Sequence, residues 1–147
     1  MIRAFLDANV LFSASNSGSP IARLLGLSLE QAEFITSDFA AEEARRNVRL
    51  KREAWAKNLD RLLRQVQVVP SIKFDLSVKL SEKDQPILCA AIRSNCHYLV
   101  TGDRKDFGHL YDHVVDGVTI ITLAKLAEIV MRARSGKQVS YTEPGQV

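Results

Sequence analysis

Acidic side chains stand at two places where a buried strand should end. Asp7 follows the apolar run IRAFL, and Asp103 follows the run HYLVTG. An acid at the end of a fully apolar strand is costly to bury unless it has a partner. If the two strands are neighbours in a parallel sheet, their carboxyl ends meet at one edge and the two carboxylates converge there. The pattern therefore favours a site built around Asp7 and Asp103.

Two further acids can join this pair from helix starts. Asp84 stands just before Pro86, a residue typical of the first turn of a helix. Glu43 lies one turn into the helix expected after the second strand, and its neighbour Glu42 would point about 100° away from it, so only one of the two can easily face inward. Each acid also has an ordinary structural interpretation, because Asp84 can be a simple helix cap and Glu43 can pair with a residue on its own helix.

The four acids together predict a particular class of ion. Carboxylates that lie close together repel one another unless a cation neutralises them. Ligand sets made only of oxygen favour Mg²⁺ or Mn²⁺, and such ions can activate water and stabilise charge on a phosphodiester. We therefore expect Mg²⁺ or Mn²⁺ to be held by Asp7, Glu43, Asp84 and Asp103.

The elements that position these acids can be predicted from apolar runs and from breaks in the sequence. The expected strands are Ile2–Leu6, Ala32–Thr36, Val66–Val69, His97–Thr101 and Val118–Ile121. The expected helices start at Pro20, at a cap on Ser37 or Asp38, at Lys51, at Pro86 and at a cap on Thr122. Because strands and helices alternate, we expect right-handed crossovers and a parallel sheet covered on both faces.

The helices have expected ends as well. The helix that starts at Pro20 carries apolar residues as far as Leu29, and the next should end near Val48. The segment from Lys51 to Val66 shows one continuous apolar face, and the final helix should reach about Arg134. Residues 8–15 form a turn or a helix, and residues 71–80 are left as a loop or a short helix.

Length and composition indicate one globular domain. The chain has 147 residues, 46% of them hydrophobic and 25% charged, with no apolar run long enough for a membrane span. Because Arg3 and Asp7 interrupt the apolar start, we expect mature protein there and not a secretory signal. Cys89 and Cys96 follow neither a zinc-knuckle nor a disulfide spacing, so we expect buried thiols in a cytoplasmic protein. Residues 1–134 should form the domain, and residues 135–147 lack periodicity and should form a tail.

Basic residues are concentrated rather than spread evenly. Arg45, Arg46, Arg49, Lys51 and Arg52 fall within eight positions. Such a cluster is compatible with a solvated helix face and with a surface that contacts phosphates. The net charge of +3 becomes +7 when the four candidate acids are left out, which suits a polyanionic substrate.

The four acidic segments, taken in order, resemble the motifs of PIN-domain nucleases. FLDANVLFSA resembles the first motif, EEARRNV the second, and KDQPILCAAI followed by HYLVTGDRKDF the third and fourth. The resemblance runs from Met1 to about Arg134 and is closest to the toxin-like, VapC-type PIN proteins of bacterial toxin–antitoxin operons. It implies a PIN-like three-layer α/β/α fold with a central parallel sheet of four to five strands.

The resemblance also implies roles for individual residues. Asp7, Glu43, Asp84 and Asp103 take the places of the metal-binding acids. The supporting positions are Asn9, Thr101, Asp106 and, if the second motif shifts by one residue, Glu42. Arg45, Arg46 and Arg104 are expected to hold an RNA backbone. The implied activity is single-strand-cutting, Mg²⁺- or Mn²⁺-dependent endoribonuclease action, with a small antitoxin and a second copy of the chain as protein partners.

Two other functions also fit part of the pattern. Phosphotransfer domains of the haloacid-dehalogenase and receiver types place an Asp at the end of their first strand. The former need a second Asp where Asn9 stands, and the latter need an early acidic pair and a late strand-end Lys that the sequence lacks. A PIN fold that binds RNA or protein without cleavage is the other alternative, and the complete set of four acids argues against it.

Overall fold

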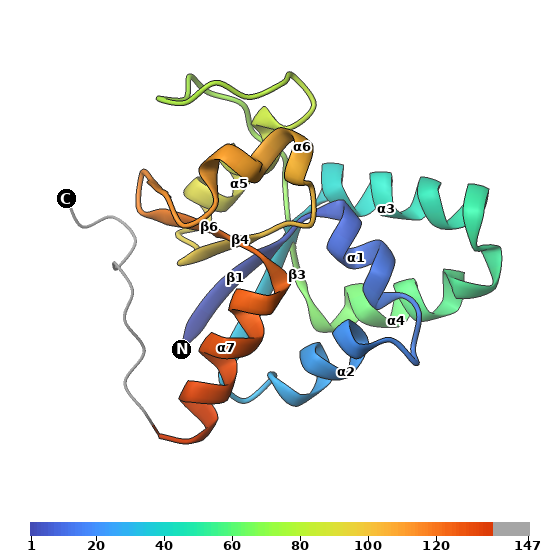
Figure 1. Cartoon of the computed structure of the whole chain (residues 1–147). Coiled ribbons are helices and arrows are strands. Elements are labelled where there is room, and N and C mark those ends of the chain that lie inside the picture. The colour runs from blue at the N-terminus through green and yellow to red at the C-terminus, as the bar shows by residue number, and fades with distance from the viewer. Residues whose placement is uncertain (137–147) are drawn as a thin grey trace.

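The computed structural model describes residues 1–136 and contains one six-stranded sheet in the order β3-β2-β1-β4-β6-β5 (Figure 1). Every neighbouring pair is parallel except β5 with β6. The strands are β1 (Ile2–Leu6), β2 (Ala32–Ser37), β3 (Gln67–Val69), β4 (Tyr98–Val100), β5 (Val114–Val115) and β6 (Val118–Ile121). Most of the predicted tail, from residue 137 onward, lies outside the described residues.

Helices lie on both sides of the sheet, as the alternation of elements predicts. They are α1 (Ala8–Ala14), α2 (Pro20–Leu27), α3 (Asp38–Lys51), α4 (Ala56–Gln65), α5 (Gln85–Arg93), α6 (Arg104–Phe107) and α7 (Leu123–Arg134), with short 3₁₀ turns η1 (Glu53–Trp55) and η2 (Gly108–Leu110). In Figure 1, α1 to α4 gather on one side of the sheet, and α5 and α6 lie on the other. Right-handed crossovers explain this arrangement. The chain moves across the sheet in one direction from β1 to β3 and in the opposite direction from β3 to β4 and β6, so the connecting helices change face.

The two central strands bring the first and fourth acidic segments together. β1 pairs directly with β4, and Leu6 is in register with Val100. Phe5 and Leu99 on these strands are fully buried, as expected for parallel strands covered on both faces. The residues that follow, including Asp7, therefore leave the sheet side by side at its carboxyl edge. The condition under which Asp7 and Asp103 converge, that their two strands are neighbours, is therefore met.

The sheet has one strand more than the four to five that were predicted. The addition is β5, which forms a tight antiparallel hairpin with β6. Asp116 and Gly117, between the two strands, both have positive φ angles, of 48° and 89°. Two positive φ angles are what a two-residue hairpin turn of type I′ requires, and Asp-Gly is one of its common sequences. This dipeptide is the signal from which β5 could have been predicted.

Two helix predictions need correction, and one helix was not predicted. The segment Lys51–Val66 is not a single helix, because the chain leaves helical geometry at Arg52 (φ −150°, ψ 61°) and resumes through η1. The helix that starts at Pro20 ends at Leu27, short of the predicted Leu29, and α6 was not predicted. Residues 71–80 are a loop without helix or strand.

Several local predictions are confirmed. Ser37 caps α3 by accepting a hydrogen bond from the Ala40 amide at 3.1 Å, and Thr122 caps α7 in the same way. Cys89 and Cys96 are both buried and neither forms a disulfide. Within residues 1–136 no helix is both long enough and apolar enough to cross a membrane.

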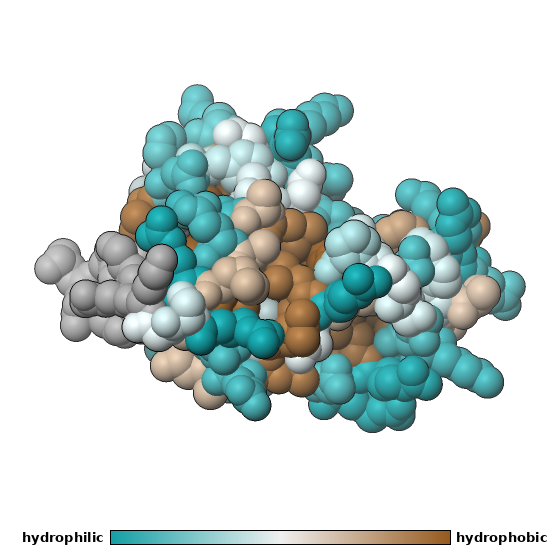
Figure 2. Space-filling model, turned by 60° about the horizontal axis from the view of Figure 1, so that its bottom comes forward, coloured by the Kyte–Doolittle hydropathy of each residue, from teal (hydrophilic) through white to brown (hydrophobic). Residues whose placement is uncertain are grey.

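One end of the molecule carries apolar side chains at its surface. Figure 2 shows hydrophobic atoms in the middle of the face that lies below α2 and α7 in Figure 1, with hydrophilic atoms around them. Leu27 at the end of α2, Leu29 after it and Met131 on α7 are large hydrophobic residues that are 44% to 59% exposed. Exposed apolar patches of this kind often mark surfaces that contact another protein.

Candidate active site

Asp7 is buried where β1 passes into α1. Its side chain is only 4% exposed. One carboxylate oxygen accepts the Ala8 amide at 2.7 Å, so Asp7 is also the N-cap of α1. The other oxygen accepts the Thr101 hydroxyl at 2.7 Å and the Asn9 side-chain amide at 3.3 Å. Three hydrogen bonds thus hold the carboxylate in place. The Asp7 amide, which donates to the Val100 carbonyl, fixes the backbone of the residue.

Thr101 and Asn9 connect Asp7 to the segment that carries Asp103. The Thr101 hydroxyl donates to Asp7 and accepts the Asp103 amide at 3.1 Å. The Asn9 side-chain oxygen accepts the Gly102 amide at 2.9 Å. A Cβ atom at Gly102 would lie 3.4 Å from that oxygen, so a side chain there would crowd the contact. The loop after β4 is therefore held to β1 by side chains.

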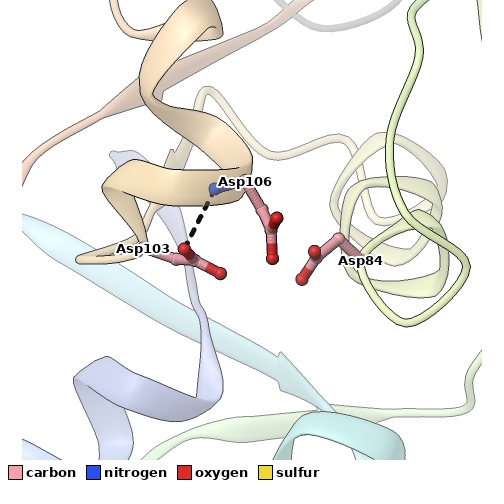
Figure 3. A group of neighbouring side chains, drawn as sticks. All are labelled: Asp84, Asp103 and Asp106. Carbon is pink, nitrogen blue, oxygen red and sulfur yellow. Dashed lines mark hydrogen bonds between the residues drawn. The ribbon is translucent and has the colours of Figure 1, made fainter.

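Three aspartates from two segments converge beside this network. Asp84 comes from the turn before α5, whereas Asp103 and Asp106 come from the start of α6 (Figure 3). One carboxylate oxygen from each lies within 4.8 Å of those of the other two. The Asp106 amide donates to the Asp103 carboxylate at 3.1 Å, which makes Asp103 the N-cap of α6. We call Asp84, Asp103 and Asp106 the aspartate triangle.

Burial and mutual repulsion disturb the protonation of these acids. The pKa of Asp7 is raised to about 6, mainly by burial and also by the nearby charges of Glu43 and Asp103, against the lowering effect of its hydrogen bonds to Thr101 and Ala8. Burial also raises the pKa of Asp84 to about 6, and contact with Asp106 adds to the rise. The same contact lowers the pKa of Asp106, because the protonated Asp84 can donate to it. Such opposed shifts are frequent in functional sites.

The two candidates of the second motif are separated by the structure. Glu42 is exposed, and its carboxylate lies 3.7 Å from the Arg49 guanidinium. Glu43 is half-buried and is one of the charges that act on Asp7. The geometry therefore favours Glu43, and Glu42 faces away from the other acids.

Two lysines that were not predicted lie beside the acids together with the expected Arg104. Lys83 lies 3.9 Å from the Asp106 carboxylate, and its charge, with that of Lys105, lowers the pKa of Asp106. Arg104 lies close enough to act on the Tyr111 hydroxyl. Arg45 is two positions from Glu43, about 200° around α3, so it points away from the site, whereas Arg46 lies within about 60° of Glu43. That Arg45 and Arg46 contact RNA remains a prediction.

Other polar contacts in this region were not anticipated from the sequence. The Ser81 hydroxyl donates to Asp84, and the Tyr111 hydroxyl donates to the Thr101 carbonyl at 2.9 Å. Ser81 precedes Asp84 by three positions, a spacing common where a side chain closes a turn, and this signal was available. Tyr111 follows no pattern that would have indicated its place.

The donor set matches a hard divalent cation. The three candidate ligands of the aspartate triangle are all carboxylates, and oxygen ligands favour Mg²⁺ or Mn²⁺ over Zn²⁺. Burial is the main cause of the raised pKa values of Asp7 and Asp84, and repulsion by neighbouring acids adds to both shifts. A divalent ion within the aspartate triangle would offset that repulsion.

The family of the chain follows from a comparison with family models. The model described as PIN domain matches residues 3–105, a span that contains Asp7, Glu43, Asp84 and Asp103. The chain belongs to the PIN domain family. The resemblance seen in the acidic motifs is thereby confirmed, and the described fold is the PIN fold.

Solved structures with the same PIN fold include toxins of VapBC systems. VapBC2 from Rickettsia felis, bound to a DNA fragment from its promoter, matches with a TM-score of 0.61 and 17% identity over 82% of this chain and 98% of that chain. VapC20 from Mycobacterium tuberculosis, described as a Sarcin-Ricin loop cleaving toxin, gives 0.55 and 14% over 76% and 98%. VapBC-1 from nontypeable Haemophilus influenzae gives 0.54 and 15% over 82% and 98%. At these identities the likeness concerns the fold. Among curated proteins no match was found.

Proposed function

We propose that this PIN-domain protein is an endoribonuclease that uses Mg²⁺ or Mn²⁺ and acts as the toxin of a toxin–antitoxin pair. The observation that carries the proposal is the aspartate triangle, in which three carboxylate oxygens lie within 4.8 Å of one another next to the buried Asp7. The fold shared with VapC20, a Sarcin-Ricin loop cleaving toxin, supports RNA as the substrate.

Each acid has a proposed role. Asp84, Asp103 and Asp106 would hold the ion, and Asp7 and Glu43 would complete its negative surroundings. The ion would supply activation of a water molecule and neutralisation of charge on the phosphodiester. Asn9 and Thr101 would keep the Asp7 and Asp103 segments in register through their hydrogen bonds.

The protein's cations would hold the RNA backbone on both sides of the acids. Lys83, Lys105 and Arg104 lie on or beside the segments of Asp84 and Asp103. Arg46 is on the same side of α3 as Glu43. Contacts to phosphate oxygens from Lys and Arg position a nucleic acid without reading its sequence. We therefore expect binding to weaken steeply as salt is raised.

Cleavage of a mixed pool of single-stranded RNA with Mg²⁺ or Mn²⁺ tests the activity. Asp103→Asn should abolish cleavage, and a chelator should do the same to the unaltered protein. Asp60→Asn is the matched control, because Asp60 is an exposed aspartate on α4 away from the acids. Cleavage that survives Asp103→Asn, or that continues in excess chelator, would refute the proposed function.

Protein partners form the second part of the proposal. The structures of VapBC2 and VapBC-1 contain VapB as well as VapC. For this chain we propose a small antitoxin, a homodimer and a cytoplasmic place of action. The exposed apolar residues Leu27, Leu29 and Met131 support a protein-binding surface near α2 and α7. Co-expression with the product of a neighbouring small gene should give a complex in which cleavage is suppressed, and light scattering of the chain alone should give twice its mass.

A further inference from the structure

The exposed side of α3 carries four residues in a line. Phe39, Glu43, Arg46 and Leu50 are spaced by three or four positions, which places them within about 60° of one another around the helix axis. The line is about 17 Å long at the normal rise of an α-helix. We call these four residues the α3 stripe. We propose that the α3 stripe is the track on which single-stranded RNA approaches the acids, with one base stacked on the Phe39 ring.

The opposite side of α3 accounts for the helix packing and leaves the stripe to solvent. Ala40, Ala41, Ala44 and Val48 are buried and form the inner face. Phe39 is 39% exposed and Leu50 is 76% exposed, although both are large and apolar. The packing of α3 does not require Phe39 or Leu50, because the alanines and Val48 already form its buried face.

Glu43 connects the stripe to the site. It lies one turn after Phe39 and one turn before Arg46, and its charge raises the pKa of Asp7. The stripe therefore includes the residue of α3 whose charge acts on Asp7. The neighbouring Glu42 is on a different side of the helix, where its carboxylate lies 3.7 Å from Arg49.

The chemistry of the stripe matches a single strand of RNA. Aromatic rings that face solvent next to cations are used to stack unpaired bases, since every base presents a π-face. Arg46 supplies a guanidinium for a phosphate oxygen. The C-terminal half of the stripe lies in a basic segment, because residues 45–64 contain eight Arg and Lys and only two acids, whereas the first two turns of α3 hold Asp38, Glu42 and Glu43. An acidic protein partner would satisfy the cations but would leave the Phe39 ring without a specific role.

The N-terminal end of the stripe is held in place. The Asp38 carboxylate accepts hydrogen bonds from the Ser71 amide at 2.9 Å and from the Ser71 hydroxyl, which in turn accepts the Phe39 amide at 3.2 Å. This reciprocal contact ties the first turn of α3 to the segment after β3. Phe39 therefore stands on a fixed backbone, which reduces the entropy lost when a base stacks on it.

The inference rests on the proposed function, and its test separates the two. The probe is a labelled single-stranded RNA of mixed sequence and about 12 nucleotides, within the usual range of site sizes. Its affinity is measured in an Asp103→Asn background, and kcat and KM are measured in the active protein. Phe39→Ala should weaken binding about ten-fold and raise KM while kcat changes little. Phe39→Trp should restore binding, and circular dichroism should confirm that each variant is folded.

Arg46 provides an independent readout. Arg46→Gln should lower the dependence of log affinity on log salt by about 0.7, the value for one phosphate contact on a single strand. Arg45→Gln, which removes a charge from the adjacent position on the other side of α3, should change that slope less. Arg23→Gln on α2 is the charge-matched control and should leave cleavage unchanged.

Several outcomes would overturn the inference while the proposed function stands. These are wild-type affinity in Phe39→Ala, equal salt slopes in Arg45→Gln and Arg46→Gln, or equal binding of fully double-stranded RNA, whose bases cannot reach the ring. A change of oligomeric state in Phe39→Ala with unchanged RNA affinity would assign the stripe to a protein contact instead. A different result would refute the proposed function itself, namely cleavage that does not depend on Asp103.

Discussion

Asp7 and the aspartate triangle lie next to each other but are held in contrasting ways. Asp7 receives hydrogen bonds from an amide, a hydroxyl and a side-chain amide, all on rigid elements around β1 and β4. The triangle is held mainly by contacts among its own acids and by Ser81 and Lys83, which are exposed. Asp7 is fixed by hydrogen bonds from the fold itself, whereas the three aspartates of the triangle would need a bound cation to offset their charge.

This difference suggests a division of labour. A carboxylate whose oxygens already accept several hydrogen bonds has little freedom to rearrange around an ion. Carboxylates that lie close together gain most when a cation offsets their mutual repulsion. We therefore expect the triangle to set metal affinity and Asp7 to set where the metal-binding loop sits. Variants on the two sides should then have different effects.

The largest expected effect is on metal binding and cleavage. Asp7→Asn and Asp103→Asn should each reduce cleavage by more than about 100-fold, beyond the range typical of residues that only support a ligand. Calorimetric titration with Mn²⁺ should nevertheless distinguish them. Asp103→Asn should lose measurable binding, whereas Asp7→Asn should bind about 10- to 100-fold more weakly. Complete loss of Mn²⁺ binding in Asp7→Asn would make Asp7 a direct ligand and remove the proposed division.

The next effect is a dependence of stability on pH in the metal-free protein. The pKa of Asp7 is about 6 in the folded protein and 3.8 ordinarily, so the folded state holds this proton more tightly. The contribution of Asp7 to the free energy of unfolding is therefore largest below about pH 4. It falls by roughly 3 kcal/mol as the pH rises from there through about 6. Urea unfolding in chelator across this range measures the fall, and Mg²⁺ should restore stability at the high-pH end.

Asp7→Asn provides the control for this pH dependence. An asparagine cannot ionise, so the variant should lose a large part of the slope and keep only what Asp84 contributes, whose pKa is also raised to about 6. An unchanged slope in Asp7→Asn would show that burial of this carboxylate does not control the stability of the metal-free protein.

A smaller effect compares the hydroxyl groups on the two sides. Thr101→Val keeps the shape of a fully buried side chain but removes its bonds to Asp7 and to the Asp103 amide. It should lower the free energy of unfolding by about 1–3 kcal/mol, the cost of buried groups left unsatisfied. Ser81→Ala removes an exposed hydroxyl from Asp84 and should cost less than about 0.5 kcal/mol. Chemical denaturation of both variants checks the contrast, and equal losses would contradict it.

How far the sequence predicted these two regions depends on the range of the interactions involved. Asp7 and Asp103 could be placed from apolar strands alone, because strand ends in a parallel sheet share an edge. Asp106 was only a supporting candidate, yet it completes the triangle. Its position depends on α6, a helix of four residues that is too short to produce an apolar period. Lys83 and Tyr111 reach the site through loops, whose course is set by contacts distant in sequence.

The fold shows the same limit. Five strands and the major helices follow local patterns, and Ser37 and Thr122 mark two helix starts as expected. The single helix predicted from Lys51 to Val66 shows one apolar face, but the backbone breaks at Arg52 so that α4 can turn back and pack against α1 and α3. That break is imposed by tertiary packing, which periodicity within one segment cannot report.

The smallest expected effect concerns adjacent acids on α3, where the sequence left the register open. Glu42 is exposed and pairs with Arg49, an arrangement that contributes at most about 1 kcal/mol. Glu43 is half-buried and acts on Asp7. Glu42→Gln should therefore leave cleavage within about two-fold of the unaltered protein, because an exposed substitution away from the site changes little. Glu43→Gln should lower cleavage about ten-fold, at the lower end for a group that supports a metal site.

Because both changes remove one charge from neighbouring positions, their general electrostatic effects are alike, and only the direction of the side chain differs. Parallel measurements of kcat/KM at one salt concentration would then reveal the facing acid, and a larger loss in Glu42→Gln would place the second motif one residue earlier.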